Sequence, residues 1–250
     1  MPATTMPPFR VLGLSPDTVD YRSAWDLQQD LHARVVEGSS PGAVLLLEHT
    51  AVYTAGKRTE PADLPDDGSP VVDVDRGGKL TWHGPGQLVC YPVVRLADPA
   101  AVKEYVWFLE EVLIRTLADL GLTGERVDGR SGVWILGGVD GQGRRTPDRK
   151  IAAIGLRVNH GVSMHGFALN CSNTLDAYEH IVACGISDAG STTLSSETGR
   201  IITPADVLAT VQEHFVALAP GHLAPVDPEQ LTGSLSGAPV MTPLRKESLQ

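Results

Sequence analysis

Short apolar runs of strand length fill the middle of this chain, and they constrain its fold more than any other feature. The run Ala43 to Leu47 is apolar throughout, which is typical of a strand buried on both faces. Other runs are rich in Val and Ile and are bounded by Gly, Pro or Asp, as strands commonly are. We predict further strands at Phe9 to Leu14, Val71 to Val74, Gln87 to Leu96, Gly132 to Leu136, Ile151 to Val158 and Val162 to Leu169.

Three segments are predicted to be helical, the third from Pro204 at a first helical turn, and they do not alternate regularly with the strands. The first extends from about Asp17 to Glu37, where Asp17 offers an N-cap and apolar residues recur at helical spacing. The second extends from about Ala101 to Leu120, and the third from about Ala205 to Leu218. Because regular βαβ alternation is missing, the pattern predicts an α+β domain with a mixed or antiparallel sheet.

The length and composition of the chain indicate one sizeable core. With 250 residues and 42% hydrophobic content, one domain is the simpler interpretation. We place this domain at residues 9–218, after a flexible N-terminus at residues 1–8. Residues 219–250 are rich in Pro, Gly, Ser and Leu without periodicity, so we expect a poorly ordered C-terminal tail.

Composition also limits which cellular compartment and which classes of partner we expect. No apolar run is long enough to span a membrane, and residues 1–10 lack the order of a secretion signal, so we expect a cytoplasmic protein without membrane contact. Three cysteines do not suggest a disulfide framework, which agrees with a reducing compartment. The formal charge of −10 disfavours nucleic-acid binding, because phosphate neutralisation requires excess Lys and Arg.

One short stretch departs from the acidic balance. It contains the basic residues Arg144, Arg145, Arg149, Lys150 and Arg157. Such a cluster could steer an acidic partner toward one face of the protein. A solvated loop without a specific role is the alternative, and composition leaves both interpretations open.

The segment from Arg76 to Gln87 is unusually rich in glycine. Glycine permits backbone conformations and close ligand approach that a side chain would block. The segment matches neither the GxxxxGK[ST] nor the GxGxxG phosphate-binding pattern. A ligand-binding loop and an ordinary glycine-rich hairpin with a structural His83 both remain possible at this point.

The three cysteines have different surroundings. Cys90 alternates within an apolar strand and is typical of a small core residue, whereas Cys171 ends a strand-like run and is ambiguous. Cys184 precedes Gly185 in a turn followed by small hydrogen-bonding residues, where a substrate could reach it. Cys184 is therefore our candidate nucleophile.

A thiol needs help to act as a nucleophile, because its ordinary pKa of about 8.5 leaves only a small fraction as thiolate at neutral pH. A lysine ammonium about 4 Å away would stabilise the thiolate by at most about 4 kcal/mol, which corresponds to about three pKa units. Lys150 opens the apolar strand from Ile151 and is our candidate partner, although most lysines are simply solvated.

Four blocks of the sequence together resemble the octanoyl-acyl-carrier-protein:protein octanoyltransferases of lipoate biosynthesis. The resemblance covers about Phe9 to Leu218. It implies the fold of the biotin and lipoate protein ligases, which is related to class II aminoacyl-tRNA synthetases. The blocks are Leu46–His49 with Val52–Gly56, Arg76–Gln87 with Tyr91–Pro92, Lys150–Gly155, and His165–Asn170 leading to Ala183–Ile186.

The resemblance assigns a role to each block. It implies that Cys184 forms the acyl thioester and that Lys150 activates it. The acyl pocket of the family is formed by the glycine-rich block and by parts of the third and fourth blocks. The substrate-binding residues implied here are Arg76, Gly77, Gly78, Lys79, Leu80, Thr81, Trp82, His83, Ala153, Ile154, Gly155, Gly166, Phe167 and Ala168.

The activity implied is transfer of an octanoyl group from octanoyl-acyl carrier protein to a lysine of lipoyl domains. The acceptors would be the E2 subunits of 2-oxoacid dehydrogenases and the glycine cleavage H protein. Because a thioester is already activated, we expect no ATP, metal or other cofactor. The chain departs from the family pattern at Thr50 and Ala183, where proline is common, and in the long segment Gly137 to Arg149.

Two other functions must be weighed against acyl transfer. An ATP-dependent lipoate or biotin ligase would share the fold and a glycine-rich pocket but would need no nucleophilic cysteine. A non-catalytic module that binds lipoyl domains would need neither Cys184 nor Lys150. Formation of an acyl-enzyme without ATP distinguishes acyl transfer from both.

Overall fold

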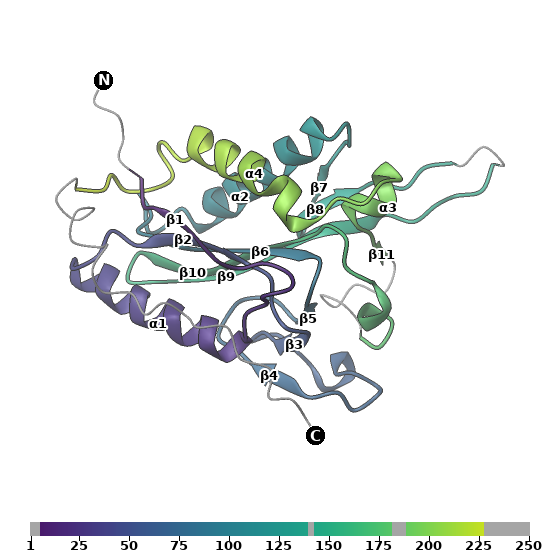
Figure 1. Cartoon of the computed structure of the whole chain (residues 1–250), viewed down its shortest axis with the longest axis horizontal. Coiled ribbons are helices and arrows are strands. Elements are labelled where there is room, and N and C mark those ends of the chain that lie inside the picture. Colours follow the sequence, from purple (N-terminus) through teal and green to yellow (C-terminus); the bar gives the residue numbers. More distant parts are fainter. Residues whose placement is uncertain (1–5, 140–142, 182–188, 228–250) are drawn as a thin grey trace.

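The computed structural model describes residues 6–139, 143–181 and 189–227, and a mixed β-sheet is the centre of this part of the chain (Figure 1). Its main path has the strand order β1-β2-β6-β10-β9-β8-β7, and β11 adds to β9. The pairs β1–β2 and β9–β11 are parallel and the others are antiparallel. The strands are β1 (Phe9–Gly13), β2 (Ala43–Leu47), β6 (Gln87–Val93), β7 (Glu125–Val127), β8 (Arg130–Ile135), β9 (Arg149–Asn159), β10 (Val162–Asn170) and β11 (Gly190–Ser191).

A second, smaller sheet consists of β4 (Val71–Asp73), β3 (Val52–Ala55) and β5 (Leu80–His83), in that order. It lies on the same side of the large sheet as the first helix (Figure 1). Strands β3 and β5 were not predicted, because both are only four residues long and β5 lies inside the glycine-rich segment. The mixed sheets and irregular order confirm the predicted α+β class.

Helices cover both faces of the large sheet. The helix α1 (Tyr21–Glu37) packs on one face, where Ala24 and Leu31 join the inner residues of β2 and β6. The helices α2 (Val102–Asp119) and α4 (Pro204–Leu218) cover the opposite face, where the larger hydrophobic cluster lies. Shorter elements are the helix α3 (Leu194–Thr198) and the 3₁₀ turns η1 (Pro61–Asp63) and η2 (Asp176–Tyr178).

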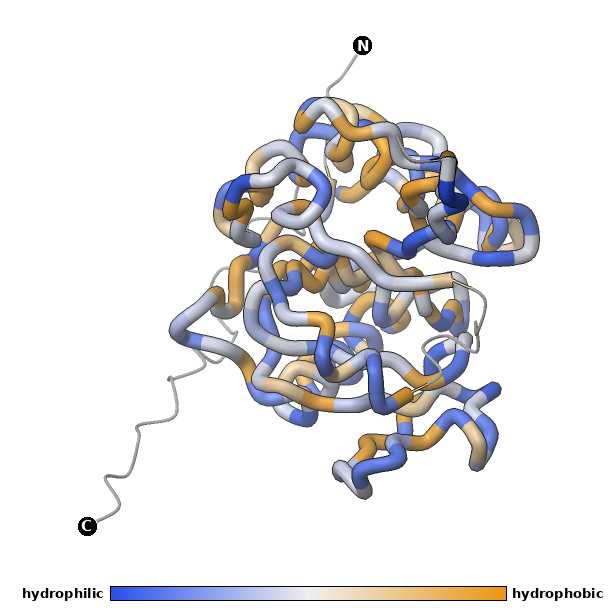
Figure 2. The backbone as a smooth tube through the Cα atoms, turned by 90° about the vertical axis from the view of Figure 1, so that its right-hand side faces the viewer, coloured by the Kyte–Doolittle hydropathy of each residue, from blue (hydrophilic) through white to orange (hydrophobic). Residues whose placement is uncertain are grey.

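Hydrophobic and hydrophilic residues are interleaved along most of the chain (Figure 2). This is the pattern expected where each helix or strand turns one side to a core and the other to solvent. No helix in the described ranges combines the length and apolar character that crossing a bilayer requires.

The start of α1 corrects one prediction. Asp17 is not the N-cap, because its N–H closes a turn on the Leu14 carbonyl and the chain then bridges to the large sheet at Val19. Asp20 caps the helix instead, by accepting a hydrogen bond from the Ser23 N–H at 2.9 Å. The cap fixes Tyr21 as the first helical residue.

The chain beyond α4 remains packed for several residues, which corrects the predicted start of the tail. Ala219 and Leu223 are buried in the larger hydrophobic cluster, and Leu223 bridges to Leu96. The N-terminal residues 6–8 also take part, since Met6 packs against the same cluster and the Pro8 carbonyl accepts from the Val44 N–H. The predictions for residues 1–5 and 228–250 lie outside the described residues.

The segment between β8 and β9 extends their hairpin into a projecting arm (Figure 1). Val139 bridges to Arg145, and the Thr146 N–H donates to the Gly138 carbonyl. At its base the Gly137 N–H donates to the Asp148 carboxylate at 2.8 Å. The residues that make this segment long therefore lie in the arm, and they enter β9 directly before Lys150.

A β-bulge at the start of β9 determines which way Lys150 faces. Val133 pairs with Ala152 and Trp134 pairs with Lys150, so Ile151 is an extra residue on the β9 side. Without the bulge, Lys150 would share a face with Ala152, which is buried in the larger cluster. With it, the Lys150 side chain emerges on the opposite face, toward the small sheet.

Candidate active site

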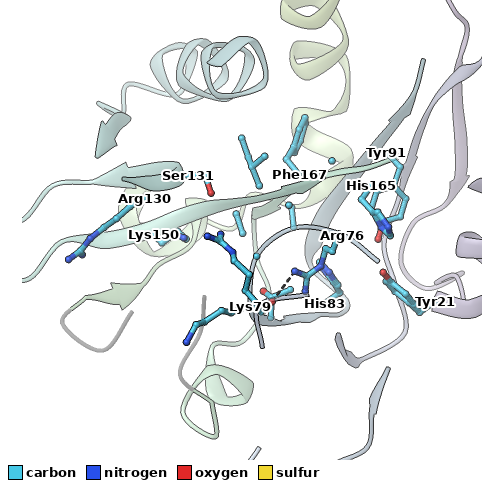
Figure 3. A pocket seen from close by; sticks show the side chains of 18 of the residues that line it. Tyr21, Arg76, Lys79, His83, Tyr91, Arg130, Ser131, Lys150, His165 and Phe167 are labelled. Atoms are coloured by element: carbon cyan, nitrogen blue, oxygen red, sulfur yellow. Dashed lines mark hydrogen bonds between the residues drawn. The ribbon is translucent and has the colours of Figure 1, made fainter. Parts of the chain in front are cut away.

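A cavity of about 280 Å³ lies where the large sheet faces β5 and the beginning of α1 (Figure 3). Its floor consists of small residues from β9 and β10, and its rim carries several cationic side chains. The lining residues are Tyr21, Arg58, Arg76, Gly78, Lys79, Thr81, His83, Tyr91, Gly129, Arg130, Ser131, Lys150, Ala153, Ile154, Gly155, His165, Gly166, Phe167 and Ala168.

Most of the residues predicted to bind substrate line this cavity. The exceptions are Gly77, Leu80 and Trp82. Side chains alternate along a strand, so Thr81 and His83 face the cavity while Leu80 and Trp82 face the small core around Tyr53. A contiguous motif such as residues 76–83 therefore overstates the number of side chains that can contact one ligand.

Lys150 lies in the cavity wall and is held by the indole ring of Trp134. Its Nζ is 4.7 Å from the ring centroid, as expected for cross-strand neighbours on one face. A smaller hollow adjoins the cavity at Lys150, and Tyr178 and Ser191 also line it. Ser191 pairs with Lys150 in the sheet. Residues from both sides of segment 182–188 therefore lie beside this lysine.

Arg76 organises the glycine-rich segment from within. Its side chain is 6% exposed, and its guanidinium donates to the carbonyls of Gly77, Lys79 and Thr54 at 2.7–3.0 Å. A side chain at Gly155 would place Cβ only 3.2 Å from Arg76 Cδ. The guanidinium thus fixes the loop against the sheet, which explains why a buried arginine and glycines occur together.

A polar network joins the cavity to the Lys150 end of the site. The amide Nε2 of Gln87 donates to Asn170 and Tyr178, both at 2.9 Å, so its Oε1 accepts from His83 Nδ1 at 2.7 Å. Burial lowers the pKa of His83 to about 3, so its ring is neutral at pH 7. Because Nδ1 carries the proton, Nε2 of His83 is the ring acceptor.

A second hydrogen-bonded chain closes the opposite end of the cavity. His49 is neutral because burial lowers its pKa to about 4, and its Nδ1 donates to the Val19 carbonyl at 3.0 Å. Its Nε2 therefore accepts from the Tyr91 hydroxyl at 2.8 Å. Burial also raises the pKa of the neighbouring Tyr21 to about 12. The tyrosines that line this end, Tyr21 and Tyr91, are neutral and lie on the far side of the cavity from Lys150 (Figure 3).

His165 lies at the aromatic end beside Tyr91, and an acidic neighbour holds it there (Figure 3). It has a left-handed backbone with φ 58°, and its Nε2 donates to Asp75 at 2.9 Å. Asp75 also pairs with Arg157. The hydrogen bond from His165 and the positive charge of Arg157 lower the pKa of Asp75 to about 2. Desolvation nevertheless lowers the pKa of His165 itself.

The predicted basic patch does not form one free surface. Arg149 and Arg157 are at the two ends of β9, and Arg149 is bound in a bidentate pair with Glu197 at 2.8 and 3.1 Å. Arg157 is paired with Asp75, and Lys150 faces the cavity. Residues close together in sequence are separated here because an extended strand carries them apart by about 3.3 Å per residue.

Solvent exposure distinguishes the cysteines as candidate nucleophiles. Cys90 and Cys171 are both 0% exposed, and burial raises the pKa of each thiol well above its ordinary value. This confirms Cys90 as a core residue and resolves the ambiguity of Cys171. Neither can present a thiolate to the cavity. Cys184 lies outside the described residues, so its pairing with Lys150 stays a prediction.

Sequence reasoning did not assign several cavity residues to the site. Tyr91 and His165 occur within the motif blocks, and this position in the sequence could have indicated that they belong to the site. The others come from the start of α1, the end of β3 and the β7–β8 turn, where no local pattern marks them. They are Tyr21, Arg58, Gly129, Arg130 and Ser131.

The chain matches known proteins over most of its length. The model of the lipoyl protein ligase A/B catalytic domain matches residues 20–216. An octanoyltransferase of Renibacterium salmoninarum is 56% identical over 232 residues, which cover 90% of this chain and 97% of the relative. An octanoyltransferase of Clavibacter sepedonicus is 58% identical over 220 residues, covering 87% and 94%.

Solved structures with low sequence identity share the fold. A lipoate-protein ligase A bound with ATP superposes with a TM-score of 0.60 at 11% identity, covering 91% of this chain and 92% of the ligase. A bipartite lipoate protein ligase from Thermoplasma acidophilum gives a TM-score of 0.61 at 13% identity, covering 91% and 90%. With this fold and the sequence matches, the chain belongs to the lipoyl protein ligase A/B catalytic-domain family, among its octanoyltransferases, and is an acyltransferase.

Proposed function

We propose that this enzyme transfers an octanoyl group from octanoyl-acyl carrier protein to a lysine of lipoyl domains, through a thioester on Cys184. The observation that carries the proposal is the elimination of the other thiols: Cys90 and Cys171 are fully buried, while Lys150 points into the cavity. Cys184 alone is left to supply the nucleophile. The proposed acceptor is supported by the T. acidophilum ligase, which is described together with its E2 lipoyl domain.

The cavity suits an unbranched acyl chain. Between Lys150 and the aromatic end, the floor is made of Ala153, Gly155, Gly166 and Ala168, whose small size leaves room above the sheet. Burial of an eight-carbon chain contributes about 0.8 kcal/mol per methylene, or about 5 kcal/mol in all. The aromatic end is compatible with the methyl terminus, so the carbonyl would lie beside Lys150.

In the first step, the Cys184 thiolate attacks the donor thioester and the tetrahedral intermediate expels the carrier's thiolate, which takes a proton from the Lys150 ammonium. In the second step, the acceptor amine attacks the Cys184 thioester and gives its proton to the Lys150 amine. Cys184 leaves as thiolate, so both residues return to their starting charges. The contact of Nζ with the Trp134 ring, worth about 0.5–2 kcal/mol, holds the Lys150 side chain in place.

Intact-mass spectrometry tests the proposal directly. Incubation with octanoyl-acyl carrier protein without ATP should add one octanoyl group to the wild-type enzyme. Cys184→Ala should abolish the adduct, whereas the matched variant Cys171→Ala should keep it, provided circular dichroism shows a folded protein. Lys150→Gln should slow its formation. An adduct that persists in Cys184→Ala would contradict the assignment.

An ATP-dependent ligase activity is the alternative function, because a ligase that binds ATP shares the fold. It would form no adduct from the carrier thioester but would consume ATP with free octanoate. Measuring pyrophosphate release with octanoate and ATP, beside the mass experiment, separates the two functions.

A further inference from the structure

The charge of the cavity is opposite to that of the protein. The whole chain has a formal charge of −10, yet the described residues that line the cavity include five cationic side chains and no carboxylate. Both lining histidines have lowered pKa values and are neutral at pH 7, so they do not alter this balance. The cationic residues are Arg58, Arg76, Lys79, Arg130 and Lys150.

Three of the five cations already have a role. Arg76 donates to the carbonyls that shape the glycine-rich segment. The Lys79 ammonium pairs with Glu60 and Asp63 at 3.2 Å each. Lys150 is the proposed proton carrier. None of these roles involves Arg58 or Arg130, whose side chains also line the cavity.

Arg58 is exposed and Arg130 is half-buried, and a hydrogen bond fixes the backbone of each. Arg58 follows β3, and its N–H donates to the Gly78 carbonyl at 3.0 Å, while its exposed guanidinium makes no hydrogen bond or ion pair with any described residue. Arg130 begins β8, where its carbonyl accepts from Trp134 Nε1 at 3.1 Å. Its guanidinium lies 5.8 Å from the Trp134 ring, on the outer side of Lys150 (Figure 3).

Binding of an acyl chain does not explain why the Arg58 and Arg130 side chains lie at the cavity. The octanoyl group is neutral, and its tail is accounted for by the small residues and the aromatic end of the cavity. Guanidinium groups, by contrast, match phosphate oxygens in geometry and charge. The thiol arm that carries an acyl group on a carrier protein ends in a phosphate, which must lie outside the cavity when the thioester reaches Lys150.

We propose that Arg58 and Arg130 form an anion subsite at the mouth of the cavity, which binds the phosphate of the donor's pantetheine arm. This proposal rests on the proposed function, because it takes Lys150 as the position of the reacting thioester. The subsite draws the phosphorylated arm to the rim, so the acyl group enters the cavity with its carbonyl facing the lysine.

The subsite can be tested with two small donors that differ only in the phosphate group. Octanoyl-pantetheine and octanoyl-4′-phosphopantetheine are compared by kcat/KM for thiol release, in the wild type and in Arg58→Gln and Arg130→Gln. The matched control is Lys57→Gln, which removes an exposed charge next to Arg58 but outside the cavity. We expect the wild type to prefer the phosphorylated donor by about tenfold or more.

Each arginine variant should lose most of this preference, because its kcat/KM should fall several-fold more for octanoyl-4′-phosphopantetheine than for octanoyl-pantetheine, and Lys57→Gln should retain the wild-type preference. Equal losses for both donors, or an unchanged preference in both variants, would overturn the proposal. The wild-type preference should also shrink as salt is raised, because exposed charges are screened.

Binding without transfer separates this proposal from the proposed function. Calorimetric titration with 4′-phosphopantetheine and with pantetheine, neither of which carries an acyl group, should show binding of the phosphorylated compound that weakens in the arginine variants. If no donor forms an acyl-enzyme but this binding is seen, the proposed function fails and the subsite stands. If ATP binds through the two arginines and 4′-phosphopantetheine does not, the subsite is a nucleotide site and our assignment is wrong.

Discussion

Glu48 is a buried carboxylate that fixes the turn of the glycine-rich segment, and its replacement by glutamine gives a stringent test of the structure. It is 2% exposed and accepts three hydrogen bonds. One oxygen accepts from the Ser15 N–H at 3.0 Å, and the other from the Ser15 hydroxyl at 2.7 Å and the Gly86 N–H at 2.6 Å.

Glu48→Gln keeps the shape of the side chain but exchanges one acceptor oxygen for a donor NH₂ group. Whichever way the amide is turned, the NH₂ group faces a backbone N–H, of Ser15 or of Gly86, and that N–H loses its acceptor. An unsatisfied buried donor costs about 1–3 kcal/mol, and the remaining bonds lose their charge assistance. We therefore expect the free energy of unfolding to fall by about 2–4 kcal/mol.

Urea denaturation followed by circular dichroism measures this loss, with the exposed Glu37→Gln as the control that also removes one negative charge. The control should change stability by less than about 0.5 kcal/mol. A Glu48→Gln protein as stable as the control would show that the carboxylate does not hold the Gly86 turn, and the reasoning about this end of the site would have to be abandoned.

Two further predictions concern the sheet around the cavity. Asp75→Asn should lower the free energy of unfolding by about 1–2 kcal/mol at pH 7; the depressed pKa of Asp75, about 2, makes this contribution present above pH 4 and lost toward pH 2. The difference from wild type should therefore be about half as large at pH 3, and urea denaturation giving equal differences at both pH values would contradict the ion-pair account. Gly166→Ala would place Cβ 2.2 Å from the Cys90 carbonyl oxygen, so we expect a loss of about 1–3 kcal/mol or more. Gly138→Ala, which meets nothing within 4 Å, should stay within about 0.5 kcal/mol of wild type in thermal unfolding, and similar melting of the two variants would refute the packing argument.

The sequence predicted the long elements well because their patterns are local. Apolar runs such as Ala43–Leu47 and the stripe of α2 gave elements close to their observed bounds. Short strands were missed because four residues such as Leu80–His83 carry little periodicity, and their pairing partners are far away in the chain. The helix start was misplaced because Asp17 and Asp20 are equally good caps, and only the bridge at Val19 excludes the first.

Only part of the site could be predicted, because local patterns do not show how distant segments pack together. The motif blocks located the floor of the cavity and Lys150, but which side chains face inward depends on strand alternation and on the bulge at Ile151. Tyr21 and Arg58 reach the cavity from elements that the sequence did not connect to it. Arg149, Lys150 and Arg157 do not share one surface, because contact depends on the path of the backbone and not only on separation along the sequence.

The bulge in β9 gives this strand one residue more than its partner, and its conformation sets the direction in which the reactive amine points. Exchange of Ile151 for another apolar residue would preserve the bulge and leave the ammonium in the cavity. A strand that kept Ile151 but lost the bulge would turn the ammonium into the apolar layer beneath α2, where a charge is strongly disfavoured. The backbone conformation between Lys150 and Ala152 is thus a functional property in its own right, and it does not depend on which apolar side chain stands at position 151.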